Sequence, residues 1–350
     1  MMIDVYTLFR PLLFAADAEA AHAATFKALD VATRLGLSRM AAPRLPADPV
    51  TVMGITFPNR VGLAAGLDKN AAHLAGLATL GFGFIEAGTV TPRAQPGNPR
   101  PRMFRVPQAQ AVINRLGFNN GGVEAFVRNV ERSGYRGVLG VNLGRNFDTP
   151  NERAADDYVK GLHAVYPYAG YVTINVSSPN TKGLRDLQSE EALGALVAAV
   201  QAERDTLASR HGRVVPLVVK LAPDLADEAL RGIARRLRAA RVDGVIATNT
   251  TLSRDGVRGM AHADEAGGLS GAPLRERSTA VVRVLADALE GSLPIIGVGG
   301  VLSGGDAREK LDAGASLVQL YTGLIYRGPA LVAECIEATA RAGSVSVRRE

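Results

Sequence analysis

The sequence predicts a (β/α)8 TIM barrel that carries a two-helix extension at its N-terminus. Three observations support this fold class. Short apolar segments recur after residue 50, alanine-rich segments of helical character separate most of them, and many of them close on Gly, Asn, Thr or Ser. Strands buried on both faces are apolar throughout, so such strands alternating with helices indicate a parallel sheet.

The extension is expected to span residues 1–39 and to form two short helices. Apolar side chains crowd the first helix, while Asp17 is a candidate N-cap and Gly36 a candidate end for the second. The segment does not have the pattern of a signal peptide, because Arg10 and Pro11 interrupt its apolar stretch and it contains acidic residues.

A Pro- and Ala-rich linker over residues 40–50 is expected to join this extension to the barrel domain, residues 51–350. Acidic and basic residues nearly cancel between residues 1 and 36. Any attachment of the extension to a membrane would therefore depend on buried apolar area more than on attraction to anionic lipid. A helical hairpin packed on its own domain or on a partner is an equally good interpretation at this stage.

The barrel prediction rests on eight apolar segments, each of which is expected to be a strand. They are VGLAAG (61–66), FIEAGTV (84–90), GVLGVNLG (137–144), YVTINVSS (171–178), PLVVKLA (216–222), GVIATNT (244–250), PIIGVGG (294–300) and LVQLYTG (317–323). Eight strand–helix units within this length match a (β/α)8 barrel. A doubly wound sheet is the alternative, but no G-x-G-x-x-G motif opens after the first segment.

Composition excludes several classes of function. The charged fraction of 21% and hydrophobic fraction of 47% favour a sizeable core over disorder. The net charge of +6 is modest, Trp is absent and aromatic residues make up 5%, which argues against nucleic-acid binding. The single cysteine, Cys335, excludes an internal disulfide and a Cys-rich zinc site. No His, Asp or Glu pair stands at metal-ligand spacing at a strand end, so we expect no metal.

Polar residues gather at the carboxyl ends of the predicted strands, where barrels of this kind place their chemistry. They are Lys69, Thr89, Asn142, Asn175, Ser178, Lys220, Thr248, Asn249, Gly299, Gly300, Tyr321 and Thr322, and the long segment after the second strand adds Asn114 and Asn119. Asparagines offer both donors and acceptors, which suits a planar ring with N–H and C=O groups. Lysines suit anionic groups, and the glycines after the seventh strand suit a phosphate.

The stretch INVSSPNTKGLRD (174–186) places two serines after a strand with no histidine within ten residues, whereas a serine nucleophile needs a base beside it. Lys220 lies inside an apolar strand and requires a ligand or a carboxylate partner. These residues leave three alternatives open: a lysine-dependent aldolase, a phosphate-binding barrel without turnover, and a soluble flavin oxidoreductase with another acceptor.

Six motifs together resemble the dihydroorotate dehydrogenases of the quinone-dependent, membrane-associated class (class 2). They are AAGLDKN, INRLGFNN, NVSSPNTKGLR, IATNTT, GVGGV and LYTGLIYRGP, and they cover essentially the whole chain. The resemblance implies an FMN-containing barrel that oxidises dihydroorotate to orotate in pyrimidine biosynthesis. Class 1 relatives have cysteine at the catalytic base position and lack the N-terminal helices, so Ser178 and the extension both point to class 2.

The resemblance also implies roles for individual residues. Ser178 is the general base, and Thr181 and Phe118 match positions that hold a relay water and screen the site. The implied orotate-binding set is Lys69, Asn114, Arg115, Leu116, Gly117, Phe118, Asn175, Asn180, Asn249 and Thr250. The implied FMN set is Ala65, Gly66, Leu67, Asp68, Lys69, Thr89, Asn142, Asn175, Lys220, Thr248, Gly271, Gly300, Tyr321 and Thr322. Lys220 is expected to stabilise negative charge on the reduced flavin near N1. His22 and Arg105 match positions that line the quinone site.

The resemblance finally implies partners and a location. The acceptor is ubiquinone or menaquinone, and residues 1–39 form the mouth of an apolar tunnel in the bilayer surface. The protein is expected to be a monomer, bound peripherally to the cytoplasmic side of a bacterial inner membrane, with no nucleic-acid partner.

Overall fold

The computed structural model describes residues 5–40 and 45–340, so residues 41–44 of the expected linker lie outside the described part. Its centre is a closed barrel of eight parallel strands in which each strand pairs with its neighbours in sequence order. The strands are β3 (Val61–Leu63), β4 (Phe84–Val90), β7 (Val138–Leu143), β8 (Tyr171–Asn175), β9 (Leu217–Leu221), β10 (Gly244–Ala247), β12 (Ile295–Val298) and β13 (Leu317–Leu320). The predicted fold class is confirmed, and every predicted apolar segment contains one barrel strand.

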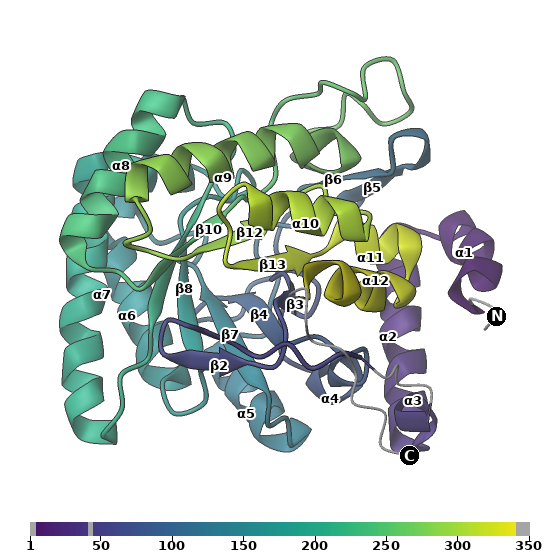
Figure 1. The fold of residues 1–350 in the computed structure, drawn as a ribbon, viewed down its shortest axis with the longest axis horizontal. Coiled ribbons are helices and arrows are strands. Elements are labelled where there is room, and N and C mark those ends of the chain that lie inside the picture. The colour runs from purple at the N-terminus through teal and green to yellow at the C-terminus, as the bar shows by residue number, and fades with distance from the viewer. Residues whose placement is uncertain (1–4, 41–44, 341–350) are drawn as a thin grey trace.

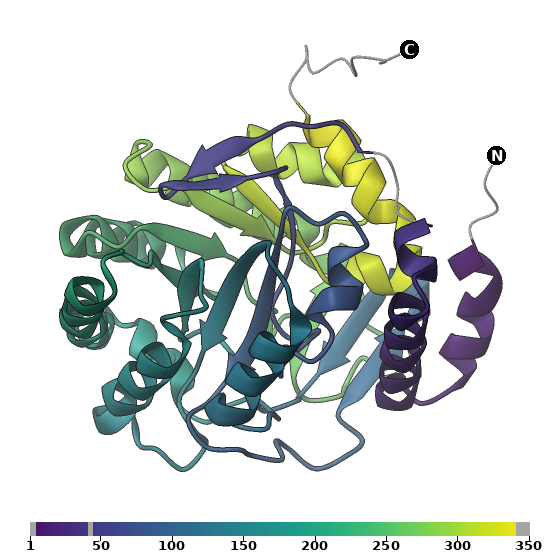
Figure 2. The same cartoon turned by 90° about the horizontal axis from the view of Figure 1, so that it is seen from below.

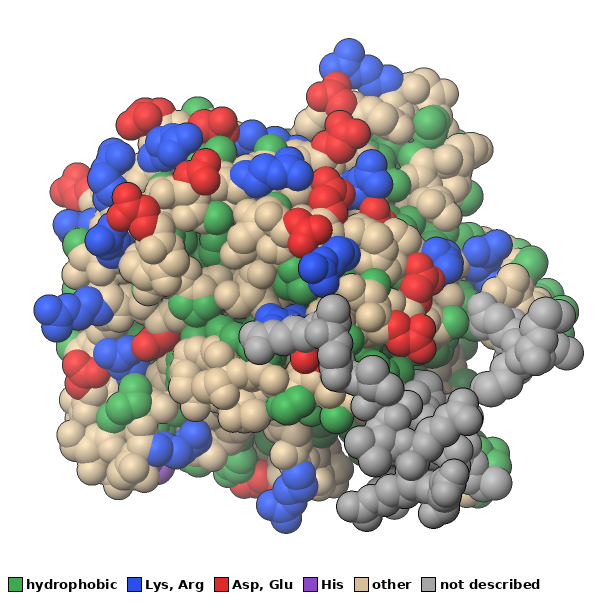
Figure 3. Space-filling view, in the orientation of Figure 1, with side chains coloured by type: hydrophobic (Ala, Val, Ile, Leu, Met, Phe, Trp, Pro, Cys, Tyr) green, Lys and Arg blue, Asp and Glu red, His purple; other side chains and the backbone are tan. Residues whose placement is uncertain are grey.

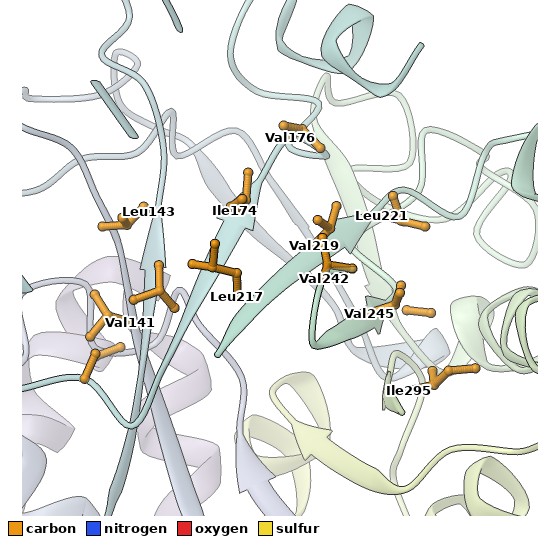
Figure 4. Close-up of a cluster of buried hydrophobic side chains, with 14 of the residues drawn as sticks. Val141, Leu143, Ile174, Val176, Leu217, Val219, Leu221, Val242, Val245 and Ile295 are labelled. Atoms are coloured by element: carbon orange, nitrogen blue, oxygen red, sulfur yellow. The ribbon is translucent and has the colours of Figure 1, made fainter. Parts of the chain in front are cut away.

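The strands are apolar throughout because both of their faces are buried. Leu217 and Val219 of β9 belong to the outer core between strands and helices, whereas Val218 belongs to the core inside the barrel. Figure 4 shows the outer core, with side chains that stand off β7, β8, β9 and β10 in turn. A hairpin of β1 (Val50–Val52) and β2 (Ile55–Phe57) adds apolar side chains to the inner core at the amino ends of the strands.

Helices follow each strand and cover the outside of the barrel (Figures 1 and 2). They are α4 (Leu74–Ala78), α5 (Val123–Ser133), α6 (Ala154–Val165), α7 (Glu190–His211), α8 (Asp227–Ala240), α9 (Arg275–Leu289), α10 (Gly304–Asp312), α11 (Thr322–Arg327) and α12 (Ala330–Thr339). Short 3-10 turns lie at Pro107–Ala109, Asn151–Arg153, Leu184–Gln188 and Ala272–Leu274. The helix α7 has local signals at both ends, since Ser189 Oγ accepts the N–H of Ala192 and Gly212 takes a left-handed conformation.

Acidic and basic side chains are interspersed over the face formed by α8, α9 and α10 (Figure 3). Ion pairs such as Arg238–Glu290 and Arg283–Glu309 join neighbouring helices there. This face therefore carries no extended field of a single sign.

A three-stranded antiparallel sheet lies outside the barrel and was not predicted. It consists of β5 (Met103–Val106), β6 (Ala111–Asn114) and β11 (Gly268–Gly271), in the order β11-β6-β5. The strand β11 pairs Gly268 with Asn114, which is far away in sequence. No local apolar pattern marks a four-residue strand with glycine at both ends, so only the long-range pairing makes it a strand.

The extension forms α1 (Val5–Ala15) and α2 (Ala18–Arg34), as predicted, and a third helix, α3 (Leu37–Met40). Asp17 is the N-cap of α2, and its Oδ1 accepts the N–H of Ala20 at 2.9 Å. Several polar contacts tie α1 and α2 to the rest of the chain. For example, Arg10 Nη1 donates to the carbonyl of Tyr326 at 2.9 Å, and the buried Arg102 pairs with Glu19 at 3.0 Å. Among the described residues, no helix is long and apolar enough to cross a bilayer.

Candidate active site

A pocket opens at the carboxyl ends of the barrel strands. Of the residues expected to bind substrate or cofactor, those that line it are Ala65, Gly66, Lys69, Thr89, Asn114, Leu116, Gly117, Phe118, Asn175, Ser178, Asn180, Lys220, Thr248, Asn249, Thr250, Gly271, Gly300, Tyr321 and Thr322. The closed barrel explains this gathering, because it brings the ends of all eight strands to one face.

Asparagine side chains form a hydrogen-bonded chain across the pocket floor. Asn142 is fully buried beneath the pocket, and its Oδ1 accepts from Thr89 Oγ1 at 2.6 Å and from Asn175 Nδ2 at 3.0 Å. Asn249 Nδ2 in turn donates to Ser177 Oγ at 3.0 Å and lies 3.4 Å from Asn175 Oδ1. Asn142 does not line the pocket itself, but its hydrogen bonds fix the positions of Thr89 and Asn175, which do.

Ser178 lies just after β8 and is 6% exposed. Its Oγ accepts the backbone N–H of Asn180 at 3.2 Å, and no histidine or carboxylate within the described residues bonds to it. An N–H that points at this oxygen stabilises negative charge on it. Ser177, by contrast, is buried away from the pocket and bonds to Asn175 and Asn249, which gives it a structural role.

The pocket rim carries two more asparagines and a lysine. Asn180 Nδ2 donates to Asn114 Oδ1 at 3.2 Å, which joins the loop after β8 to the end of β6. Lys69 is half-buried and donates to the carbonyl of Gly66 at 2.7 Å. Burial lowers the pKa of Lys69 from 10.5 to about 8, with Glu19 acting in the opposite direction.

Lys220 lies in β9 and is buried at the base of the pocket. Burial lowers its pKa, and the charge of Glu86 partly restores it. Its ammonium makes no hydrogen bond to any residue that the structure describes. A buried ammonium without acceptors favours a ligand that presents oxygen, nitrogen or negative charge.

Two glycines at the far side of the pocket let neighbouring segments of the backbone pack closely. A side chain at Gly300 would collide with the Arg275 backbone at 2.3 Å, and one at Gly271 would collide with the Gln110 carbonyl at 2.2 Å. Both glycines have left-handed φ angles, of 73° and 100°. Both glycines line the pocket, and backbone N–H groups at such positions suit a phosphate group.

Five residues of the expected set do not line this pocket. They are Leu67, which lines a second cavity, and Asp68, Asn142, Arg115 and Thr181. Asp68 accepts the N–H groups of Ala72 and His73, and burial raises its pKa. Arg115 pairs with Glu265 at 2.6 Å and stacks on Phe104, so its charge is used outside the pocket.

The second cavity is apolar and lies between the extension and the barrel. His22, Phe14 and Leu29 line it from α1 and α2, and Arg105 lines it from β5. Burial is the main cause that lowers the pKa of His22 to about 4, so this imidazole is neutral at pH 7. Tyr321 lines this cavity as well as the polar pocket, and so forms a boundary between them.

Residues 49–341 match the family described as dihydroorotate dehydrogenase. The chain belongs to the dihydroorotate dehydrogenase family. The dihydroorotate dehydrogenase (quinone) of Thiobacillus denitrificans is 62% identical over 337 residues, which cover 96% of this chain and 100% of that protein. The dihydroorotate dehydrogenase (quinone) of Burkholderia thailandensis is 62% identical over 341 residues, which cover 97% of this chain and 99% of that protein. A solved structure of DHODH from Eimeria tenella in complex with ferulenol has a TM-score of 0.81 at 39% identity and covers 89% of both chains.

Sequence reasoning missed several pocket residues of this dihydroorotate dehydrogenase family member. They are Ala64, Ser270, Leu274, Val298, Val301, Gln319 and Gly323. Gln319 had a detectable signal, because it is the one polar residue in an otherwise apolar strand segment, LVQL. Ser270 had none, since it lies in the unpredicted strand β11.

Proposed function

We propose that this chain oxidises (S)-dihydroorotate to orotate, with FMN as the hydride acceptor and a membrane quinone as the final electron acceptor, in pyrimidine biosynthesis. The observation that carries the proposal is a polar pocket, lined by Ser178 and four asparagines, that shares Tyr321 with an apolar cavity. Two half-reactions with a polar and an apolar reactant require this combination of sites. FMN, when bound, takes a hydride from dihydroorotate and passes the electrons to the quinone.

The residues of the pocket fit FMN. Gly271 and Gly300 would hold its phosphate through their backbone, because both line the pocket together with Thr322, the first residue of α11. Thr89 and Asn175 would bind its ring edge from the floor. Lys220, buried and without an acceptor, would place positive charge beside the ring and favour electron-rich states of the cofactor.

Ser178 would remove the proton from C5 of dihydroorotate. A serine hydroxyl is a poor base at neutral pH, so its position and a proton relay must assist it. The N–H of Asn180 stabilises charge that develops on Oγ. Phe118 covers the pocket and would limit access of water, and Gly144 makes room for its ring, which a Cβ would meet at 2.8 Å. Thr181 lies buried behind the pocket and would hold the relay water.

The rim residues would bind the substrate. Asn114 and Asn180 bond to each other and could offer their remaining donors and acceptors to the ring amides. Asn249 and Thr250 would bind it from the opposite side of the pocket. Lys69 would pair with the substrate carboxylate, because it is the less buried of the two lysines that line the pocket.

The affinity for orotate is expected to fall about tenfold per pH unit once the pH rises above the Lys69 pKa. Burial lowers that pKa to about 8, so Lys69 is charged below this pH and neutral above it. A bound carboxylate raises the pKa of Lys69 in the complex, so the affinity stops falling only above that higher pKa. Calorimetric titration with orotate between pH 7 and pH 10 measures this, and Lys69→Met should flatten the profile. Lys182→Met, which alters an exposed lysine on the loop after β8, should not. An unchanged profile in Lys69→Met would exclude this lysine as the carboxylate partner.

The apolar cavity would receive ubiquinone or menaquinone. His22 and Arg105 would contact its polar ring oxygens, with His22 as a neutral donor. The side chain of Arg105 is fixed in position, because its Nη1 donates to the carbonyl of Leu13 and its guanidinium stacks on the Phe14 ring. Residues 1–39 would form the quinone and membrane part, residues 40–50 the linker and residues 51–350 the FMN-binding barrel.

The chain would bind the cytoplasmic side of a bacterial inner membrane as a peripheral monomer. The helix α1 turns Leu8, Phe9 and Leu12 to solvent, and this apolar edge would dip into the lipid surface.

Anaerobic titration of the purified protein with dihydroorotate, followed by its visible spectrum, tests the proposal. A flavin band that bleaches and returns when a quinone is added is the expected result. A flavin band that persists would reject dihydroorotate as substrate. A colourless protein that retains no flavin after reconstitution, and that borohydride labels at Lys220 with a carbonyl substrate, would favour a Schiff-base aldolase instead.

A further inference from the structure

Glu86 is a fully buried carboxylate inside the barrel, 0% exposed, to which none of the roles above assigns a function. It lies in β4, beneath the pocket. Across the eight barrel strands, all of which are described, the titratable residues are Glu86 in β4, Tyr171 in β8 and Lys220 in β9. The barrel interior therefore holds one acid and one base among apolar and amide side chains.

Three neutral groups donate to the Glu86 carboxylate. They are Asn142 Nδ2 at 2.7 Å, Tyr171 Oη at 2.8 Å and Gln319 Nε2 at 2.7 Å. These bonds satisfy its oxygen atoms but leave its charge uncompensated. An opposite charge close by would stabilise a carboxylate buried this deeply beyond what these hydrogen bonds provide.

Lys220 is the one cation on the described barrel strands, and its strand places it beside the network that holds Glu86. The pairing of β8 with β9 aligns Lys220 with Asn175. Asn175 donates to Asn142, and Asn142 donates to Glu86. Burial lowers the pKa of Lys220, and the negative charge of Glu86 raises it. The strands on either side of β9 add no competing charge, since β8 contributes only Tyr171 and β10 contains no titratable residue. Lys69 lines the same pocket, but it enters from the loop after β3.

Glu86 also determines which way the asparagines point. A carboxylate only accepts hydrogen bonds, so Asn142 must turn its NH2 group down to Glu86 and its Oδ1 up to Thr89 and Asn175. Asn175 then presents its NH2 to Asn142 and its Oδ1 to Asn249 and Ser177. One buried carboxylate thus sets the order of donors and acceptors along the pocket floor.

We propose that Glu86 is a positioning residue that keeps Lys220 charged and orients the asparagine chain beneath the bound cofactor. The proposal rests on the proposed function, in which Lys220 lies beside the FMN ring. Glu86 touches neither substrate nor cofactor, and acts through Lys220, Asn142 and Gln319.

The first test counts the protons taken up when bound FMN is reduced by two electrons at neutral pH. With Lys220 charged, its ammonium favours an anionic reduced flavin, and the wild type should take up about one proton. In Glu86→Gln the lysine has no counter-charge and should lose its proton while the flavin is oxidised. Reduction should then take up about two protons, one of them by Lys220 or by the reduced ring. Dithionite reduction in weakly buffered dye solution measures the count, after the protons released by oxidation of dithionite are determined in a blank with free FMN of known proton uptake and subtracted.

Tyr171→Phe is the matched control, because it removes one donor to the same carboxylate and leaves the charge in place. It should keep the count near one. A count of about one in Glu86→Gln with FMN bound would overturn the proposal. A count of about two in both variants would also overturn it, because general disturbance of the barrel would then explain the change.

The second test needs no flavin. Urea unfolding of the flavin-free whole chain is compared for Glu86→Gln, Lys220→Met and the double variant. Removing one member of the pair leaves the other buried and uncompensated, so the double variant should be more stable than the two single effects predict. If the single variants fail to fold while the double variant folds, the result also supports the pairing of Glu86 with Lys220. Strictly additive effects would overturn the proposal. If the wild type binds no FMN, the proposed function fails while this cycle still decides the pairing.

Discussion

Ser178→Ala is expected to slow the reduction of bound flavin by dihydroorotate by about 10²–10⁴-fold while the protein stays yellow. The substitution removes the hydroxyl that would take the C5 proton, but it changes none of the residues proposed to hold FMN. Stopped-flow measurement of flavin bleaching under anaerobic conditions isolates this half-reaction, since no quinone is present.

Ser177→Ala is the matched control for this prediction. Ser177 is the adjacent serine, fully buried and bonded to Asn175 and Asn249 instead of facing the pocket. Its loss should slow bleaching by less than about tenfold, the cost of roughly one hydrogen bond. Wild-type bleaching in Ser178→Ala would remove this residue from the reaction. An equal loss in both variants would point to a damaged loop.

The double variant Leu8→Glu/Leu12→Glu is expected to weaken binding to phosphatidylcholine vesicles by about 100-fold. Leu8 and Leu12 are 69% and 70% exposed on α1. Each leucine buried in lipid contributes about 1.5 kcal/mol or more, and together they account for a factor of this size. Neutral vesicles are the right probe, since apolar area is the proposed driving force. Cosedimentation with the vesicles gives the bound fraction.

This surface change should leave the chemistry of the polar pocket intact. Flavin reduction by dihydroorotate should stay at the wild-type rate, while turnover with a long-chain quinone in vesicles should fall. Val214→Glu adds a charge at an apolar position that is 63% exposed between α7 and β9, and it should bind vesicles like the wild type. Undiminished cosedimentation of the double variant would show that α1 is not the membrane contact.

The eight barrel strands were predictable because their signals are local. Each is a short apolar run bounded by turn residues, and strands such as β9, with Leu217 and Val219 outward and Val218 inward, must be apolar on both faces. The barrel geometry then places strand ends together, so that Ser178, Lys220 and Asn249 could be assigned to one pocket before any contact was known.

Other features depend on pairings that no local pattern carries. The strand β11 exists because Gly268 pairs with Asn114, which is far from it in sequence. This pairing brings Ser270, in the same strand, to the pocket. The side chain of Arg115, a residue predicted to bind substrate, pairs with Glu265, which lies far from it in sequence. The hydrogen-bond partner of a long side chain is decided by what the fold brings beside it.

The sequence by itself determined the order of strands and helices, the N-terminal helices and the residue types at the strand ends, because these follow from periodicity and turn chemistry. Only the tertiary structure decided that Glu86 and Lys220 share one barrel interior, that Asn142 works from beneath the pocket, and that Tyr321 separates a polar pocket from an apolar cavity. The physical reason is that burial and charge pairing are set by distances in space, which closure of the barrel creates between residues far apart in the chain.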